Sequence, residues 1–434
     1  MKKYYSCKDI ESSLYIAPNE IRACCQRFFH KGKMRGDAKL LDIKDDVTPK
    51  AEDIINSRKK LFNEIQHNNS ESCNGCPFLY ETNKPPSFGS DIEHLSIEHH
   101  SVCNLRCTYC SETYYGGKRS KYNVVEFIKY LSDSGSFKNC KQVVWGGGEP
   151  TLDKSFELIV EEIDKFANPN IYHRVFTNSV RFHEAVIKFL KKGLIKIVTS
   201  IDAGDEVTFK KVRGRDKFFN VFENLSKYSK IDSDKITIKY IFTKENSNEN
   251  QLTKFVKECV SNNLQNCAYQ ISMNYKYENL SLNMLKKASF LMNELKKNNI
   301  NKFFPDDHIA SRFKKLSEAE KKELLEYANK KNIEKIFINH SKIKNLNIYG
   351  IGDIAINILN KTNVLNIFDK VELFDGDISK IGTEVNKHRI MRPEDIKLND
   401  YKIFISTAQS YDDIYQKLIK MNIDSNRLVS GIFI

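Results

Sequence analysis

Residues 101–112 read SVCNLRCTYCSE and place three cysteines, Cys103, Cys107 and Cys110, within one short stretch. Three thiolates separated by three and then two residues can bind three irons of an iron–sulfur cube and leave the fourth iron without a protein ligand. Because an open iron can bind a small molecule, the spacing indicates chemistry rather than passive electron transfer. Zinc is the usual alternative for close cysteines, but a structural zinc site needs four ligands in paired knuckles.

A second motif, VVWGGGEPT, occupies residues 143–151. The triplet with Tyr109 before its last cysteine, followed by a strand-like run that ends in Gly-Gly-Glu-Pro, resembles the two signature motifs of radical S-adenosylmethionine (SAM) enzymes. The resemblance implies a catalytic [4Fe–4S] cluster on the triplet, with SAM bound to the open iron. One electron from the reduced cluster would break a sulfonium C–S bond. The resulting 5′-deoxyadenosyl radical would abstract hydrogen from a substrate.

The resemblance also implies cofactor-binding residues in the two motifs. Gly147 and Gly148 have no Cβ, so the backbone there can approach SAM closely. Glu149 can accept a hydrogen bond from the ammonium group of SAM. Tyr109 is expected to contact the adenine through its backbone.

Three more polar residues, Asn178, Ser200 and Asp202, each come at the carboxyl end of a strand-like run. Ligands of α/β folds bind at this edge, so these side chains are expected to contact the ribose hydroxyls and carboxylate of SAM. The alternative is that they only cap loops, because Asn, Ser and Asp also favour turns.

From residue 91 to about residue 280, strand-like runs alternate with amphipathic stretches. Val124, Phe127, Ile128 and Leu131 follow helical spacing, and Gly193 is placed to end a helix. Six such repeats predict an α/β fold with a parallel sheet, and the resemblance implies a partial (β/α)6 barrel over 91–280. The expected strands are 94–99, 142–147, 172–178, 195–202, 235–242 and 268–274.

The composition is that of an ordinary globular protein. The chain has 434 residues, 40% of them hydrophobic, which is enough for two or three domains. It has no apolar run long enough for a membrane span and no signal peptide at its N-terminus, so a cytoplasmic location is expected. The net charge of +13 is spread over scattered lysines, so a nucleic-acid partner is not expected.

The N-terminal segment, 1–90, contains another set of cysteines. The spacing of Cys7, Asn19 and Cys24 resembles the first half of the SPASM auxiliary-cluster domain, with Asn19 in place of a glycine, and Cys73 and Cys76 form a Cys-x2-Cys pair. Asn tolerates a left-handed turn well. The expected ligands of a second [4Fe–4S] cluster are Cys7, Cys24, Cys73 and Cys76. A structural zinc site on the same four thiols is the alternative.

The last part of the chain changes character. Residues 281–340 look helical, with a Ser-x-x-Glu start near Ser317, and are expected to be a connector. Residues 341–434 then read as a small Rossmann-like domain, with a strand, a Gly-x-Gly-x-x-Ala turn and a helix. Its run resembles nucleotide-sugar-binding domains of surface-polysaccharide enzymes. Gly350, Gly352 and Asp375 are its expected nucleotide-binding residues, with NAD binding or a purely structural role as alternatives.

These features predict a radical SAM oxidoreductase or isomerase that acts on a carbohydrate or nucleotide-sugar in surface-glycan biosynthesis. Modification of a peptide or protein side chain is the alternative, since many SPASM enzymes act in that way. The expected partners are a small-molecule substrate and an electron donor such as flavodoxin or ferredoxin. Cys25, Cys140, Cys259 and Cys267 have no assigned ligand role, although any of them could donate a hydrogen atom in a radical epimerisation.

Overall fold

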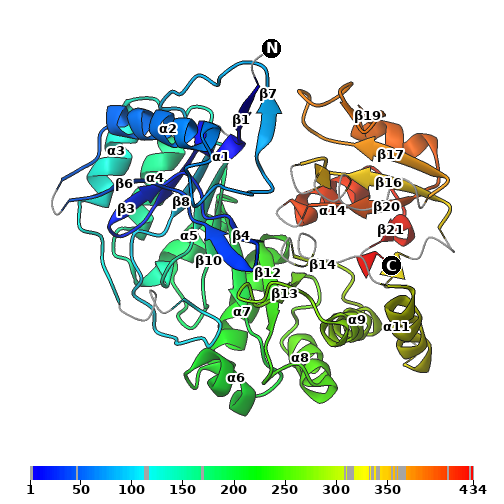
Figure 1. Cartoon of the computed structure of the whole chain (residues 1–434). Coiled ribbons are helices and arrows are strands. Elements are labelled where there is room, and N and C mark those ends of the chain that lie inside the picture. Colours follow the sequence, from blue (N-terminus) through cyan, green and yellow to red (C-terminus); the bar gives the residue numbers. More distant parts are fainter. Residues whose placement is uncertain are drawn as a thin grey trace. The chain divides into compact units, whose positions relative to one another are not determined.

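A computed structural model gives the fold of the chain (Figure 1). The chain divides into two compact units, which are described separately: the first comprises 1–199, 213–215 and 230–236, and the second comprises the remaining residues. The structure describes residues 3–433 except 45–46, 112–116, 168–170, 307–308, 310–316, 332, 334–336, 339–342, 353–354, 357–358, 360–367, 408–409 and 430–431.

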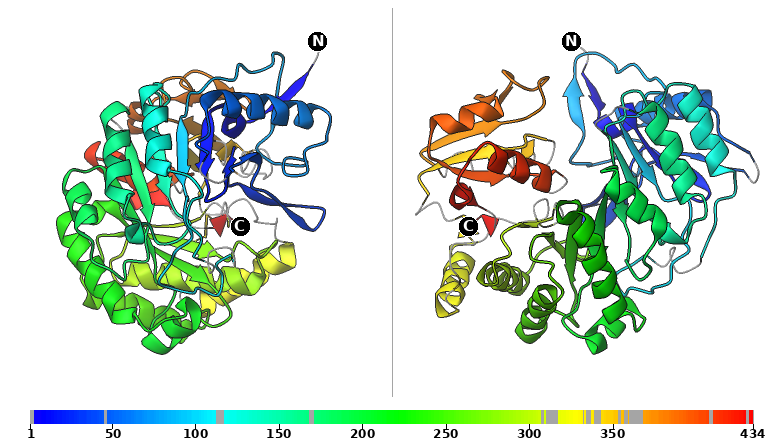
Figure 2. Two further views of the ribbon diagram at one scale, coloured as in Figure 1. Left: turned by 90° about the vertical axis from the view of Figure 1, so that its left-hand side faces the viewer. Right: turned by 180° about the vertical axis from the view of Figure 1, so that it is seen from behind.

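The first unit contains four parallel strands that neighbour one another in chain order. Helices connect them, as parallel strands require. The helices are amphipathic, since Phe127, Ile128 and Leu131 of α3 (Val124–Asp133) are buried. The helices α3 and α4 (Phe156–Phe166) lie side by side (Figures 1 and 2). The elements are β8 (His94–Ile97), α3 (Val124–Asp133), β9 (Gln142–Trp145), α4 (Phe156–Phe166), β10 (Tyr172–Phe176), α5 (Glu184–Lys191) and β11 (Ile195–Ser200).

Strands from the N-terminal segment extend the same sheet. β2 (Ser13–Ile16) pairs in parallel with β8, β3 (Glu20–Arg22) is antiparallel to β2, and β6 (Lys39–Asp42) is antiparallel to β3. The expected boundary at residue 90 therefore does not separate two compact units. The other elements of this segment are β1 (Tyr4–Ser6), α1 (Lys8–Ser12), β4 (Arg27–His30), β5 (Lys33–Gly36), α2 (Ala51–Gln66) and β7 (Tyr80–Thr82).

The second unit continues the alternation of strands and helices. Its strands β12, β13 and β14 are parallel neighbours, and α8 packs against α9, which packs against α11 (Figure 1). The elements are α6 (Glu206–Arg213), α7 (Phe218–Asp232), β12 (Ile236–Phe242), α8 (Glu249–Ser261), β13 (Ala268–Met273), α9 (Leu282–Lys297), β14 (Phe303–Pro305) and α11 (Glu318–Lys330).

All six predicted strands are present as β8 to β13, in an α/β fold with parallel strands, as a partial (β/α)6 barrel requires. Ser317 and Glu320 form the expected capping box of α11, and Gly193 follows α5 with a φ of +73°. The expected helical connector, however, also contains the strand β14. Three residues of strand are too short to give a readable alternation in sequence.

The C-terminal part of the second unit contains a six-stranded sheet. Its strand order is β18-β19-β17-β16-β20-β21, with β17 and β20 parallel to the central β16. The connection therefore reverses direction at β16, where ligands of doubly wound sheets bind. The elements are β16 (Asn345–Tyr349), β17 (Lys370–Phe374), β18 (Glu384–Val385), β19 (His388–Met391), β20 (Lys402–Ile405), α14 (Tyr411–Lys420) and β21 (Leu428–Val429); β15 (Phe337–Ile338) pairs separately with β22 (Ile432–Phe433).

This C-terminal sheet and α14 share an apolar core with β13 and β14 of the same unit. Phe304 of β14 stacks on Tyr411 of α14 with ring centroids 4.6 Å apart and planes 23° apart. Beside the stack, Lys302 Nζ lies 3.8 Å from an oxygen of Asp412. The stack and the shared core bury apolar area, which stabilises the attachment of α14 to β14.

Among the described residues, no helix is both long enough and apolar enough to cross a membrane.

One buried arginine joins the N-terminal segment to the strands. Arg58 of α2 is fully buried and donates through Nη1 to the carbonyl of Gly89 and through Nη2 to that of Ser13, each at 2.8 Å. Burial lowers the pKa of its guanidinium to about 10. The helix α2 is thus tied to both the start of β2 and the loop that leads to β8.

We expect Arg58→Ala to lower the free energy of unfolding by about 3 kcal/mol, because hydrogen bonds to a charged donor are lost and two carbonyls lose their partner. Lys59→Ala, on the exposed side of the same helix, is the control and should change it by less than about 0.5 kcal/mol. Urea denaturation followed by circular dichroism measures both. Equal stability of the two variants would contradict the role given to Arg58.

Candidate active site

The Gly-Gly-Glu-Pro turn lies directly against the loop that leads into the cysteine triplet. The N–H of Gly148 donates to the carbonyl of His100 at 3.0 Å, and the N–H of Glu149 donates to that of Val102 at 2.8 Å. Gly147 has a φ of +82°, a conformation that glycine adopts without steric cost. Two motifs about 40 residues apart in the sequence are therefore joined by backbone hydrogen bonds.

The same contact explains why the turn needs glycines. A Cβ on Gly148 would lie 2.2 Å from the carbonyl oxygen of Val102, and one on Gly147 would lie 2.8 Å from that of His100. The space that a side chain would fill is thus occupied by the cysteine-bearing loop. The prediction that these glycines admit a close backbone approach holds for this loop, whereas an approach to SAM stays a prediction.

Glu149 is almost fully buried and has side-chain partners in two segments, the turn that follows it and the end of β10. One carboxylate oxygen accepts from the hydroxyls of Thr151 at 2.7 Å and Thr177 at 2.6 Å. The other accepts from the N–H of Asn178 at 2.6 Å. The carboxylate therefore ties the end of β9 to the end of β10. It keeps lone pairs for a further donor, because each carboxylate oxygen has two.

Asn178 lies beside the first cysteine of the triplet. Its side-chain nitrogen is 3.8 Å from the sulfur of Cys103 and 2.6 Å from the side-chain oxygen of Asn104, while its own side-chain oxygen accepts from the N–H of Val180. The structure thus brings Asn178, Glu149 and the triplet together, as the sequence predicted. A contact of Asn178 with SAM is a separate matter that stays a prediction.

The three thiols are partly buried at the end of a short turn, in which the N–H of Cys110 donates to the carbonyl of Cys107 at 3.0 Å. Burial, followed by the neighbouring thiols of Cys107 and Cys103, raises the pKa of Cys110 to about 12. Burial also raises the pKa of Cys103. Such thiols are protonated at neutral pH until a metal displaces the proton, and three grouped soft donors fit an iron–sulfur cluster.

Arg213, at the end of α6, is a residue that the sequence reading missed. Its guanidinium contacts the hydroxyl of Tyr109, lies 5.8 Å from the centre of that ring, and its carbonyl accepts from the N–H of Arg106 at 2.9 Å. Its positive charge opposes the rise in pKa of both Cys103 and Cys110. No local motif announces this arginine, because only the fold places it beside the triplet.

Ser200 and Asp202 belong to the second unit. Ser200 is partly exposed at the end of β11, which leaves its predicted contact with SAM untested. Asp202 has no exposed surface and a φ of +62°. Its carboxylate accepts from the N–H of Ile241 at 2.6 Å, and its carbonyl accepts from Asn246 at 2.9 Å. The carboxylate thus bonds to β12, as the loop-capping alternative expects, and a contact of Asp202 with SAM stays a prediction.

The N-terminal cysteines gather around α2. Cys7, Cys24 and Cys73 pack in one cluster with its apolar face, and the N–H of Cys76 donates to the carbonyl of Cys73 at 3.0 Å. Burial raises the pKa of Cys76 to about 11, to which Cys73 also contributes. By contrast, Cys25 is exposed. The arrangement agrees with the predicted choice of Cys24 rather than Cys25.

The three residues predicted for nucleotide binding meet at the carboxyl end of β16. Asp375 accepts from the N–H of Ile351 at 2.8 Å, between Gly350 and Gly352, and its other oxygen accepts from the N–H of Asp377 at 2.8 Å. Lys380 lies 3.2 Å from the same carboxylate. Asp375 thus holds the glycine turn, and a bond to ribose stays a prediction.

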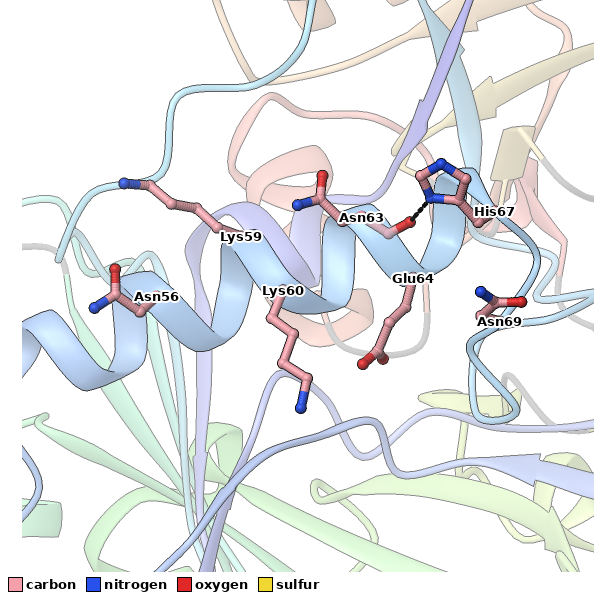
Figure 3. Close-up of a pocket in the computed structure, with 7 residues that line it drawn as sticks. All are labelled: Asn56, Lys59, Lys60, Asn63, Glu64, His67 and Asn69. Carbon is pink, nitrogen blue, oxygen red and sulfur yellow. Dashed lines mark hydrogen bonds between the residues drawn. The ribbon is translucent and has the colours of Figure 1, made fainter.

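A surface hollow of about 480 Å³ lies elsewhere, along the outer face of α2 (Figure 3). In Figure 3 the side chains of one helix and the turn after it form the wall, and His67 bonds to the carbonyl of Asn63 at 2.8 Å. No described residue that lines this hollow belongs to either cysteine set or to the glycine turn. It is the solvated side of a helix whose other side, with Leu61, Phe62 and Ile65, faces the core.

We expect Gly148→Ala to lower the cluster content of the protein, because the new Cβ would push against the Val102 carbonyl and displace the loop that ends in Cys103. Overpacking of this kind costs about 1–3 kcal/mol. The measurement is iron per chain after anaerobic reconstitution. Gly89→Ala is the control, since a Cβ there meets nothing closer than 3.9 Å. Equal iron in both variants would contradict the packing role of Gly148.

Comparison with known proteins places residues 97–256 in the radical SAM superfamily. This range contains the triplet, the glycine turn and Asn178. Among curated proteins, the chain is 28% identical over 171 residues to the GTP 3′,8-cyclase of Mannheimia succiniciproducens. This alignment covers 39% of this chain and 50% of that protein. It is 29% identical over 189 residues to the GTP 3′,8-cyclase of Pasteurella multocida, which covers 42% and 56%. The chain thus spans about half the length of the curated relatives that it matches.

Solved structures give more distant similarity. Streptococcus suis SuiB bound to the precursor peptide SuiA matches with a TM-score of 0.41 and 16% identity, over 62% of this chain and 59% of that one. A structure of anSMEcpe with bound AdoMet matches with a TM-score of 0.36 and 23% identity, over 45% and 57%. The family match over the residues that carry both motifs identifies residues 97–256 as a radical SAM domain.

Proposed function

We propose that this radical SAM enzyme abstracts hydrogen from a carbohydrate or nucleotide-sugar, and that oxidation, epimerisation or dehydration follows. The observation that carries the radical chemistry is the meeting of the cysteine triplet, Glu149 and Asn178, within the range that matches the family. The nature of the substrate depends on the C-terminal part of the chain. The predicted place in surface-glycan biosynthesis belongs to this proposal as well.

The family's [4Fe–4S] cluster and SAM together supply the radical that abstracts hydrogen. In this chain Cys103, Cys107 and Cys110 would hold the cluster. Glu149, fixed by Thr177 and by the N–H of Asn178, would accept from the ammonium group of SAM with its remaining lone pairs. Because its partners fix this carboxylate before any ligand arrives, little ordering is needed when SAM binds.

Arg213 supplies positive charge to the same place. It contacts Tyr109 and opposes the raised pKa of Cys103 and Cys110. A guanidinium that favours thiolates there also favours an anionic cluster. We therefore assign Arg213 the role of positioning the triplet turn through Tyr109 and the backbone of Arg106.

Two observations support a substrate that carries a nucleotide. The curated relatives are named GTP 3′,8-cyclase, so relatives of the barrel include enzymes named for a nucleotide. The chain also has a Rossmann-like sheet, with Gly350 and Gly352 at the strand where the sheet's connection reverses, and such edges bind nucleotides. Asp375 would there accept from a ribose hydroxyl with the remaining lone pair of the oxygen that bonds to Asp377.

The alternative substrate, a peptide or protein side chain, is favoured by the N-terminal cysteines, which resemble a SPASM domain. We favour an auxiliary [4Fe–4S] cluster over zinc on these four thiols, because the neighbouring radical SAM domain already implies cluster assembly.

The central test is reductive cleavage of SAM. The full chain, reconstituted with iron and sulfide, should form 5′-deoxyadenosine with SAM and dithionite, and the Cys103→Ala/Cys107→Ala/Cys110→Ala variant should not. Cys25→Ala, which changes an exposed cysteine outside both sets, is the control and should retain activity. Formation of 5′-deoxyadenosine by the triple variant would disprove the site.

The substrate is tested in the same assay with deuterated candidates. A nucleotide-sugar labelled on its carbohydrate ring should pass deuterium into 5′-deoxyadenosine, as mass spectrometry would show. Transfer from a labelled peptide and none from any nucleotide-sugar would overturn the proposed substrate class and leave the radical chemistry intact.

The auxiliary cluster predicts the iron of two cubes per chain. Cys24→Ala should lose the iron of one cube, whereas the neighbouring Cys25→Ala should keep both, because Cys24 packs with Cys73 and Cys25 is exposed. Metal analysis and electron paramagnetic resonance measure this. One equivalent of zinc, with iron for a single cube, would instead establish the zinc alternative.

A further inference from the structure

Two histidines and an aspartate meet in the first unit, outside the residues assigned to SAM and the clusters. In His99, His100 and Asp153, one ligand atom from each side chain lies within 4.8 Å of the other two. The histidines are buried, and the Asp153 side chain is 13% exposed. Imidazole and carboxylate are the donors of many zinc and iron sites.

The hydrogen bonding of this group is incomplete. His99 Nε2 lies 3.0 Å from Asp153 Oδ2, yet no donor is aligned with Oδ2, and His99 Nδ1 also has no hydrogen-bond partner among the described residues. The other aspartate oxygen is occupied, since it accepts from the N–H of Ser155 at 3.0 Å. A buried polar atom without a partner costs about 1–3 kcal/mol, so the unpartnered Asp153 oxygen beside two imidazoles points to a missing ligand.

We propose that His99, His100 and Asp153 bind one divalent transition-metal ion of the zinc type, which nothing in the family's motifs requires. Two ligands at about 2.1 Å from one ion lie roughly 3.0–3.4 Å apart in octahedral or tetrahedral geometry. The separation of His99 Nε2 and Asp153 Oδ2 already falls in this range. His100, whose ring centre lies 5.1 Å from that of His99, completes the set with a ligand atom within 4.8 Å of the other two.

The ion has a structural role at this position. His99 and His100 belong to the loop that leads to Cys103, whereas Asp153 ends the short helical turn that follows Glu149 (Pro150–Leu152). An ion between them joins the same two segments that the Gly148 and Glu149 backbone bonds join. Because its ligands are buried, it takes water rather than substrate as a further ligand. The ion therefore stabilises the contact between the loop that leads to Cys103 and the turn that contains Glu149.

The test is zinc uptake by the reconstituted full chain. After both cluster sites are loaded, the protein is incubated with Zn²⁺ alone and passed through a desalting column. We expect one zinc per chain and an X-ray absorption spectrum at the zinc edge with nitrogen and oxygen ligands only. His99→Gln and the isosteric Asp153→Asn should both lose this zinc. His94→Gln, a partly exposed histidine at the other end of β8, is the control and should retain it.

Two results would overturn the proposal. Equal zinc in the wild type, His99→Gln and Asp153→Asn would show that the group is a plain histidine–aspartate contact. Sulfur ligands in the absorption spectrum would place the zinc in a cysteine site. Iron content and circular dichroism of each variant establish that it is folded and cluster-loaded, and Asp153→Asn keeps the oxygen that caps Ser155, so misfolding does not imitate a positive result.

Discussion

The close approach between the end of β9 and the loop that follows β8 is the constraint on which the site depends. The N–H groups of Gly148 and Glu149 bond to the carbonyls of that loop, and there is no room for a Cβ on Gly147 or Gly148. The loop then continues directly into Cys103. The cysteine triplet and the Glu149 carboxylate, which come from separate motifs, are thus joined by backbone hydrogen bonds.

Buried polar groups complete this arrangement. Glu149 takes hydrogen bonds from Thr151, Thr177 and Asn178, and Asn178 in turn reaches the sulfur of Cys103. Networks of this kind are costly when incomplete and rigid when satisfied. The side chains that face the cluster are therefore in place without any ligand, and Arg213 adds a positive charge where an anionic cluster would lie.

Much of the fold could be predicted because the strands β8 to β13 are apolar and regularly spaced. The same reasoning missed β2, β3, β6 and β14, since these strands of three or four residues stand outside the regular alternation of strands and helices that marked β8 to β13. The glycines were predicted to approach SAM, and the close approach in the structure is to protein backbone. Asp202 was predicted to contact SAM because it ends a strand run. Its bond to the N–H of Ile241 depends on a left-handed backbone, which a sequence does not display. Arg213 was missed for a related reason: its neighbours come from the cysteine loop, far away in the chain.

The stack of Phe304 on Tyr411 decides whether the C-terminal part can be separated from the rest of the chain. A module that is simply appended to an enzyme can be exchanged or lost without harm, because its boundary is a linker. Here the boundary is an apolar core to which Ala268 and Phe304 of the sheet contribute alongside Tyr349 and Tyr411. Removal of the C-terminal part would expose Ala268 and Phe304 to water and favour aggregation. The two parts are therefore not independent domains. A recombinant boundary near residue 340 would cut through their shared core rather than between domains.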